Sequence, residues 1–235
     1  VGVRSTVAGR TDALGFHGGS IPNEISGNDT GVELVAAQMQ NQRVIGNTVG
    51  VTGSGILGGA DIATANVIEG DQVGVSAFGG TIQFNRIGAN RFGIIAESDS
   101  IIESNHIYRN TQAGIAIEGE SGVRIEGNTM YTPAGDLVRL TSGASNVTVL
   151  RNTLWTENGY DLFVANDSQS GFFSDFNNLY ATGSGKVGFW TRDFSDVLDW
   201  QADIARFDLN SVGATVVNPE WGRPRFESRH HDEYG

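Results

Sequence analysis

Two glutamates stand at equivalent places in neighbouring apolar segments, and they are the first candidates for chemistry. Glu97 ends "GIIAE" and Glu118 ends "GIAIE", so each follows a glycine by four residues. If the two segments are adjacent strands, the carboxyl groups lie roughly 5 Å apart. That separation suits the acid and the nucleophile of a retaining glycosidase. A solvated acidic face on an acidic protein is the alternative.

A histidine and an arginine are the further candidates for catalysis. His106 is the one histidine inside the repeated part of the chain, and Arg86 and Tyr108 are expected beside it. An imidazole at such a place can act as general acid or base. His106 and Arg139 would then assist the two glutamates, and an ordinary surface role is the alternative.

More carboxylates surround the glutamate pair in the sequence. They are Asp99, Glu103, Glu120 and Glu126. Carboxylate oxygens are the ligands that Ca²⁺ prefers. Ca²⁺ is therefore a candidate cofactor, although no motif requires a metal.

Four aromatic residues recur at one position of consecutive repeats. Tyr108, Tyr131, Trp155 and Tyr180 each lie three residues after a repeated asparagine. Stacked on an outer face, they would form a stripe about 15 Å long. Aromatic planes pack against the C–H faces of sugars, so we expect these residues, with Arg86, to bind a sugar chain.

A helix could instead cover the stripe. The segment "SDVLDWQADIARF" (195–207) places apolar residues at helical spacing after Ser195, a candidate N-cap. It would lie on the stripe or close the open end of the fold. A ligand platform and a covered packing surface are therefore both open.

Seven asparagines set the frame that positions these residues. Each is followed two residues later by an apolar residue, and they are Asn47, Asn66, Asn85, Asn105, Asn128, Asn152 and Asn177. A second series of segments interleaves with them, for example "GILGG" at 55, "GVSAF" at 74 and "GIIAE" at 93. A period of about 20 residues with several short strands is the signature of a solenoid.

The repeat assigns most of its members to the scaffold. We expect the asparagines to stack in a ladder at a tight corner, where Asn tolerates a left-handed backbone. The glycines should permit positive φ at the start of a strand. Val49, Ile68 and Ile107 are examples of expected core residues, whereas Phe78 is expected in the outward column of Glu97 and Glu118.

The repeat also carries a family resemblance. The stretch "ESNHIYRNTQAGIAIEGESGVRIEGNTM" (103–130) resembles the repeat unit of the pectin-lyase-like superfamily, and the likeness covers about residues 25–190. Three strands and three turns close one coil within about 20 residues, which predicts an all-β fold, a parallel β-helix of roughly eight coils, and the resemblance implies that it is right-handed. It implies no single chemistry, because the superfamily includes lyases, hydrolases, epimerases, phage tailspikes and non-catalytic proteins. The basic or Asp/His/Glu signatures of its lyases and epimerases have no match here.

Composition limits the partners. The formal net charge is −12, which disfavours nucleic acid. No stretch approaches the ~18 apolar residues of a membrane span. The chain has no cysteine, which excludes disulfides and thiolate catalysis.

We divide the chain into a parallel β-helix (1–190), a C-terminal cap of a short helix and an extended stretch (191–224) and a flexible tail (225–235). Repeat arrays need capped ends. No N-terminal cap is apparent in residues 1–24, which predicts an upstream domain or a homo-oligomer that covers this end.

Two functions remain open. The first is a secreted or cell-surface protein that binds a polysaccharide and, if it is an enzyme, cleaves it as a hydrolase or lyase. The second is a non-catalytic structural or adhesive solenoid in a larger cell-surface or phage-type assembly.

Overall fold

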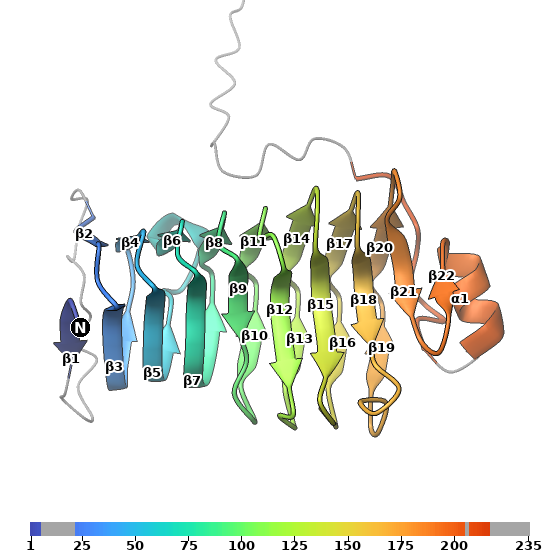
Figure 1. The fold of residues 1–235 in the computed structure, drawn as a ribbon, viewed down its shortest axis with the longest axis horizontal. Helices are drawn as coiled ribbons and strands as arrows, with labels where there is room; N and C mark the ends of the chain where they lie inside the picture. Colours follow the sequence, from blue (N-terminus) through green and yellow to red (C-terminus); the bar gives the residue numbers. More distant parts are fainter. Residues whose placement is uncertain (6–21, 205–206, 217–235) are drawn as a thin grey trace, which may run out of the picture.

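The computed structural model describes residues 1–5, 22–204 and 207–216 as a parallel β-solenoid (Figure 1). The first sheet has eight parallel strands, one from each successive coil. They are β2 (Glu24–Ser26), β4 (Arg43–Ile45), β6 (Val67–Glu69), β8 (Arg86–Gly88), β11 (His106–Tyr108), β14 (Thr129–Thr132), β17 (Thr153–Thr156) and β20 (Asn178–Ala181).

Two further sheets complete the coil. The second sheet contains β9 (Phe92–Ile95), β12 (Ala113–Glu118), β15 (Asp136–Thr141), β18 (Tyr160–Val164) and β21 (Lys186–Phe189). The third sheet contains β10 (Ile101–Glu103), β13 (Arg124–Glu126), β16 (Thr148–Leu150) and β19 (Phe173–Asp175). These assignments confirm the predicted all-β parallel solenoid.

Three long strands join the second and third sheets at the N-terminal coils. They are β3 (Thr30–Met39), β5 (Val49–Leu57) and β7 (Val73–Gln83). Strand β7 pairs with β9 through its first half and with β10 through its last residues. Register shifts within β3 and β5 accommodate the bend by which these long strands pass from the second sheet to the third. The remaining elements are β1 (Val3–Ser5), parallel to β3, the 3₁₀ helix η1 (Ile62–Thr64), β22 (Asp193–Phe194), antiparallel to β21, and α1 (Val197–Ile204).

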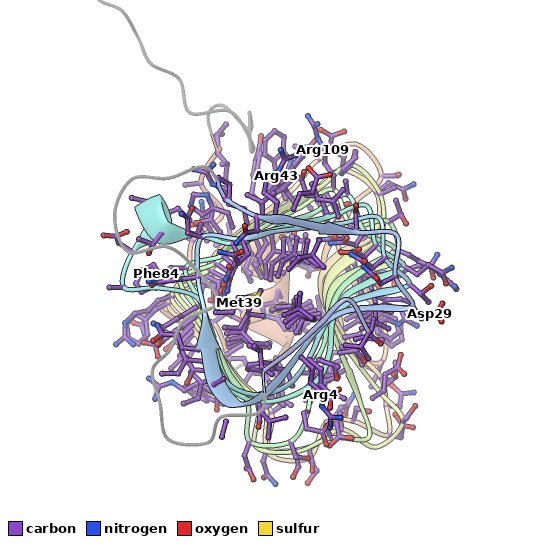
Figure 2. All side chains as sticks on the ribbon, turned by 90° about the vertical axis from the view of Figure 1, so that its left-hand side faces the viewer. Arg4, Asp29, Met39, Arg43, Phe84 and Arg109 are labelled. Carbon is purple, nitrogen blue, oxygen red and sulfur yellow. The ribbon has the colours of Figure 1, made fainter. Side chains whose placement is uncertain are left out.

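The core fills the interior of the coil. Strand side chains alternate between inside and outside, and Ile68, Ile87 and Ile107 occupy one inward column in adjacent rungs. Figure 2, viewed along the solenoid, shows stacked apolar side chains inside, with Met39 among them and Arg4 and Arg109 at the periphery. Phe78 is also buried in this core, so its predicted outward position is wrong. The bulge between β5 and β7 changes its register.

A ladder of amide side chains lines the corner that precedes the first sheet. Asn105 Oδ1 accepts hydrogen bonds from the Asn85 backbone and side-chain nitrogens at 2.9 and 3.0 Å, and the same pattern repeats along the coils. The members of this first ladder are Gln42, Asn66, Asn85, Asn105, Asn128, Asn152 and Asn177. These hydrogen bonds confirm the predicted ladder. It satisfies backbone amides at the corner that no neighbouring strand can reach.

The sequence pattern assigned Asn47 to the wrong ladder. Gln42 occupies the place in the first ladder that was expected for Asn47, and the Gln42 backbone N–H donates to Asn66 Oδ1 at 3.0 Å. The core residue of that coil is accordingly Val44, whose exposure is 0%, instead of Val49.

Asn47 belongs to a second ladder, at the corner between the first and second sheets. The members of the second ladder are Asn28, Asn47, Asp71, Asn90 and Asn110. In both ladders the left-handed backbone lies one residue before the amide in most coils, for example at Ser104 and Ala89. The amide residues themselves therefore do not need the left-handed conformation that we expected of them.

The glycines of the second series lie against the second ladder. Gly31, Gly50, Gly74 and Gly93 form one column, so "GILGG" at 55 was out of register and Gly50 holds that place. None of the four has positive φ, contrary to expectation. The reason for glycine is space: a Cβ on Gly93 would lie 2.8 Å from Asn110 Nδ2 and 2.4 Å from the Gly114 carbonyl oxygen.

Helix α1 closes the C-terminal end of the solenoid instead of covering the aromatic stripe. Trp200 is fully buried against Gly188 of β21 and packs edge-on against Phe194. The helix cap is Asp196, whose carboxylate accepts the Asp199 N–H at 2.8 Å, instead of the predicted Ser195. Ser195 accepts a hydrogen bond from Lys186. The extended stretch that follows bridges to the last rung, where the Ala214 N–H donates to Asn178 Oδ1.

The other end and the tail are only partly described. Strand β1 adds one parallel strand beside β3. The prediction that no cap covers residues 1–24 falls largely on residues 6–21, and the predicted flexible tail (225–235) also lies outside the described residues. Both stay predictions.

Candidate functional site

The four aromatic residues form the column that the repeat predicted. Tyr108 pairs with Tyr131, Tyr131 with Trp155, and Trp155 with Tyr180, on the outer side of strands β11, β14, β17 and β20. The ring centroids of Tyr131 and Trp155 are 4.7 Å apart, and those of Trp155 and Tyr180 are 5.8 Å apart. The rings of Tyr131, Trp155 and Tyr180 therefore touch along the solenoid axis.

The two tyrosines of the N-terminal half are not open platforms. Tyr108 is 5% exposed and Tyr131 9% exposed. The Tyr108 ring lies over Gly88, where no side chain blocks it, and its hydroxyl donates to Glu69 at 2.5 Å. Burial, together with the Glu69 carboxylate, raises the pKa of Tyr108. Tyr108 thus presents little ring surface to a ligand, and its role in sugar binding stays a prediction.

Tyr131 is held in the same way. Its hydroxyl donates to Glu157 Oε1 at 3.0 Å, and burial followed by that carboxylate raises the pKa of Tyr131. Its ring also packs against Trp155. Tyr131 thus supports the next ring of the column more than it offers a face of its own.

Trp155 and Tyr180 are the half-exposed members of the column. The Trp155 indole N–H donates to Thr182 Oγ1 at 3.0 Å, which fixes the ring plane. A ring that is oriented before a ligand arrives loses little freedom on binding. The role of these two residues in sugar binding stays a prediction.

A groove continues the column beyond Tyr180. It has a volume of about 350 Å³ and lies between the last rung and the start of α1. Its walls are mostly apolar and come from Leu179, Tyr180, Ala181, Val187, Ser195, Asp196, Val197, Leu198 and Gly213. Tyr180 lines this groove and its ring contacts that of Trp155, so the two rings and the groove adjoin one another, and we call them together the terminal platform.

Arg86 and His106 lie side by side on the first sheet, N-terminal to the platform. They occupy adjacent rungs of one outward column, and both are half-buried. Burial first, and then the Arg86 guanidinium, lower the pKa of His106. The imidazole is therefore neutral at neutral pH. A neutral imidazole can accept a proton, so the geometry is compatible with the predicted acid/base role.

The predicted glutamate pair lies on another part of the solenoid. Glu118 ends β12 of the second sheet and is exposed, and Glu97 stands at the equivalent place after β9. Both adjoin the corner that leads to the third sheet, whereas His106 and the aromatic column lie on the first sheet. The structure thus does not bring the glutamates together with His106 or with the sugar-binding residues.

Arg139 shares the second sheet with the glutamates but already has partners. Its guanidinium donates to Asp136 Oδ2 at 2.6 Å and lies 4.2 Å from the centre of the Phe163 ring. Burial raises the pKa of Asp136, and the Arg139 guanidinium opposes that shift. Arg139 holds this part of the outer face together, and its predicted assistance to His106 is not supported by their positions on different sheets.

Two of the four carboxylates considered for Ca²⁺ have other partners. Glu120 accepts hydrogen bonds from Ser98, and Glu126 pairs with Arg124 and Arg151. Among residues 1–5, 22–204 and 207–216, no three His, Asp or Glu side chains come together as a metal site. The candidate Ca²⁺ site therefore finds no ligand set in this part of the chain.

Sequence reasoning missed the partners of the aromatic column. Glu69 occupies the column of Tyr108 two rungs earlier, so the repeat register contained a signal for that contact. Glu157 and Thr182 lie in turns, where no strand register applies, and no pattern pointed to them. The groove depends on how α1 packs against β21, which the repeat does not encode.

Comparison with known families decides the classification. The family described as "right handed beta helix region" matches residues 37–196. The chain belongs to the right-handed β-helix family. Comparison with curated proteins and with solved structures returns no match.

Membership establishes the architecture of this β-helix and leaves its activity to its own residues, because function resides in sites grafted onto folds. In the described part of the β-helix, no helix is long and apolar enough to cross a membrane.

Proposed function

We propose that this β-helix is a secreted or cell-surface protein that binds a neutral polysaccharide at the terminal platform. The observation that supports the proposal is that the ring of Trp155 contacts that of Tyr180, and that Tyr180 in turn lines the groove beside α1. Sugar rings present apolar C–H faces that pack on such rings. The net charge of −12 disfavours an anionic chain.

The order of the rungs suits a chain ligand. Adjacent rungs are about 4.8 Å apart, so a ligand that follows the column meets one side chain per rung. Trp155 and Tyr180 would then hold consecutive sugars, and the groove beside α1 would take the next unit or the chain end. Because the Trp155 ring is already positioned by Thr182 and Tyr131, that ring requires little ordering on binding.

A polysaccharide depletion assay tests this function. Wild type, Trp155→Ala and Phe163→Ala would be mixed with a panel of insoluble polysaccharides, and the protein left in solution would be measured. Phe163 is the matched control, because it is a half-buried aromatic on the outer side of the second sheet. We expect one polysaccharide to deplete wild type and Phe163→Ala, and to deplete Trp155→Ala at least ten-fold less. Binding that survives in Trp155→Ala, or that is absent from every polysaccharide, would contradict the proposal.

One observation favours a second candidate function, a structural or adhesive solenoid without catalysis. Tyr108 and Tyr131 are buried, and their hydroxyls donate to Glu69 and Glu157 of the protein itself. The separation of Glu97 and Glu118 from the aromatic column also gives a hydrolase no shared cleft on the described surface. Cleavage by the two glutamates stays a prediction for a separate site, at the corner between the second and third sheets.

A further inference from the structure

One carboxylic acid interrupts the second ladder. Asp71 stands between Asn47 and Asn90, and its exposure is 3%. Its Oδ1 does what an asparagine oxygen does, because it accepts the Asn47 backbone N–H at 2.5 Å and the Asn47 side-chain NH₂ at 3.1 Å. Its Oδ2 is buried and has no hydrogen-bond partner among the described residues.

The neighbouring coils show what Oδ2 faces. In them the side-chain nitrogens of Asn47, Asn90 and Asn110 donate to backbone carbonyls of the preceding rung, those of Ile25, Ile68 and Ile87, at 3.2 Å each. By the same register, the carbonyl that corresponds to Asp71 is that of Val44.

Asp71 Oδ2 takes the place of these nitrogens. A Cβ built on Gly50 would lie 2.7 Å from Asp71 Oδ2, and a Cβ built on the equivalent Gly74 would lie 2.9 Å from Asn90 Nδ2. Oδ2 thus occupies a position where the ladder has a donor and the surroundings offer an acceptor. A carboxylate cannot donate, whereas a protonated carboxyl group can.

We propose that Asp71 is a proton-binding group of the folded protein, and that its protonation completes the second ladder and stabilises the coil of β6 and β7 in acidic conditions. With the proton on Oδ2, the acid is a close match in shape to asparagine and donates where asparagine donates. Without the proton, a buried negative charge faces a carbonyl oxygen, which is costly.

The electrostatic surroundings support this inference. Burial raises the pKa of Asp71 to about 6, against the lowering effect of the hydrogen bonds from Asn47. No charged side chain contributes to that shift. Glu69, the last residue of β6, accepts the Tyr108 hydroxyl, Arg91 of the next turn lies over the Phe92 ring, and Asp29 of an earlier turn is exposed.

The direction of the pH dependence follows. The ordinary pKa of this carboxyl group is 3.8, so the folded protein binds the proton more tightly than the unfolded chain. The stabilisation is fully present below about pH 4 and is lost as the pH rises through about 6. This group makes the solenoid more stable in mildly acidic than in neutral surroundings.

The test compares thermal unfolding of wild type and Asp71→Asn at pH 4.5 and 7.5. Asn keeps the shape and supplies a permanent donor, so we expect the midpoint temperature of Asp71→Asn to exceed that of wild type by several degrees at pH 7.5 and to differ little at pH 4.5. Burial also raises the pKa of Asp136 and Asp161, so the wild type alone has more than one source of pH dependence. Both proteins contain these two residues, so the difference in midpoint temperature between them reports on Asp71. An equal difference at both pH values would overturn the proposal.

A matched variant and a direct titration complete the experiment. Asn90→Asp places the same acid one rung further along, and it should lower the midpoint temperature more at pH 7.5 than at pH 4.5. In wild type, the carboxyl ¹³C resonance that Asp71→Asn removes should titrate with a midpoint near 6. A midpoint in the ordinary range of aspartate would contradict the proposal even if a variant failed to fold.

Discussion

At the scale of single residues, Asp208 ends the first ladder and ties it to the cap. Its carboxylate accepts hydrogen bonds from the Trp200 indole, the Asn177 side chain and the Ser174 and Ser211 hydroxyls, at 2.6 to 3.0 Å. The Ser211 hydroxyl in turn accepts the Asn177 N–H at 2.8 Å. Asp208 and Ser211 together thus replace the amide that an additional rung would supply.

Removing Asp208 should therefore destabilise the protein strongly. Asp208→Ala leaves several buried donors unpaired, and we expect a loss of roughly 2–4 kcal/mol in the free energy of unfolding. Urea denaturation followed by tryptophan fluorescence would measure it. Asp203→Ala is the control, because Asp203 is exposed on α1 and pairs with the exposed Arg192, so its loss should stay below about 0.5 kcal/mol. Equal stability of the two variants would disprove the role of Asp208.

The positions of residues that recur in every coil could be predicted from the sequence, whereas the role of a residue that occurs at a single place in the fold could not. Seven recurring asparagines indicated the first ladder, and six of them lie in it. Asn47 was misassigned because Gln42, one methylene longer, also fits the corner and hides the true register. Asp208 has no counterpart along the chain, so no periodicity could identify its four donors.

At the scale of the elements, the glycine column fixes how closely the corner packs. Gly93→Ala would place a methyl group 2.4 Å from the Gly114 carbonyl oxygen, so the second ladder or strand β12 must shift. We expect a loss of roughly 1–3 kcal/mol in the free energy of unfolding, as for other overpacked sites. Thermal or urea unfolding of the purified variant would measure it.

Gly79→Ala is the matched control within β7. A Cβ at Gly79 meets no atom within 4 Å, and the backbone there does not have positive φ. This substitution should leave stability unchanged or raise it by about 0.5 kcal/mol. A larger loss for Gly79→Ala than for Gly93→Ala would refute the packing explanation of the column.

Strand positions could be read from the sequence more accurately than the exposure of their side chains. The period of two correctly placed Tyr108 and Tyr131 outside the core, yet neighbouring rungs and turns bury both. The alternation in a strand reports the face of a residue and not what covers that face. The same limit explains why the glutamate pair and the aromatic column, both outward, were expected to share a site.

At the scale of the whole molecule, three sheets give the β-helix three separate outer faces. The first sheet carries the aromatic column, and the second carries Arg139 and its aromatic neighbours. The helical cap α1 closes the core with Trp200 and, in the same packing, forms a wall of the groove beside Tyr180. Capping and ligand binding are therefore predicted to share the first turn of α1, where Val197 and Leu198 line the groove one turn before Trp200.

An NMR titration tests the proposed function most directly. It follows the indole N–H resonances of the protein while an oligosaccharide ligand is added. Trp155 lies in the terminal platform and Trp200 in the cap, where its N–H donates to buried Asp208, so one molecule contains both probe and control. We predict that a fragment of the polysaccharide that depletes the protein shifts the Trp155 resonance and leaves that of Trp200 in place. A ligand that binds without moving Trp155 would contradict the assignment of polysaccharide binding to this surface.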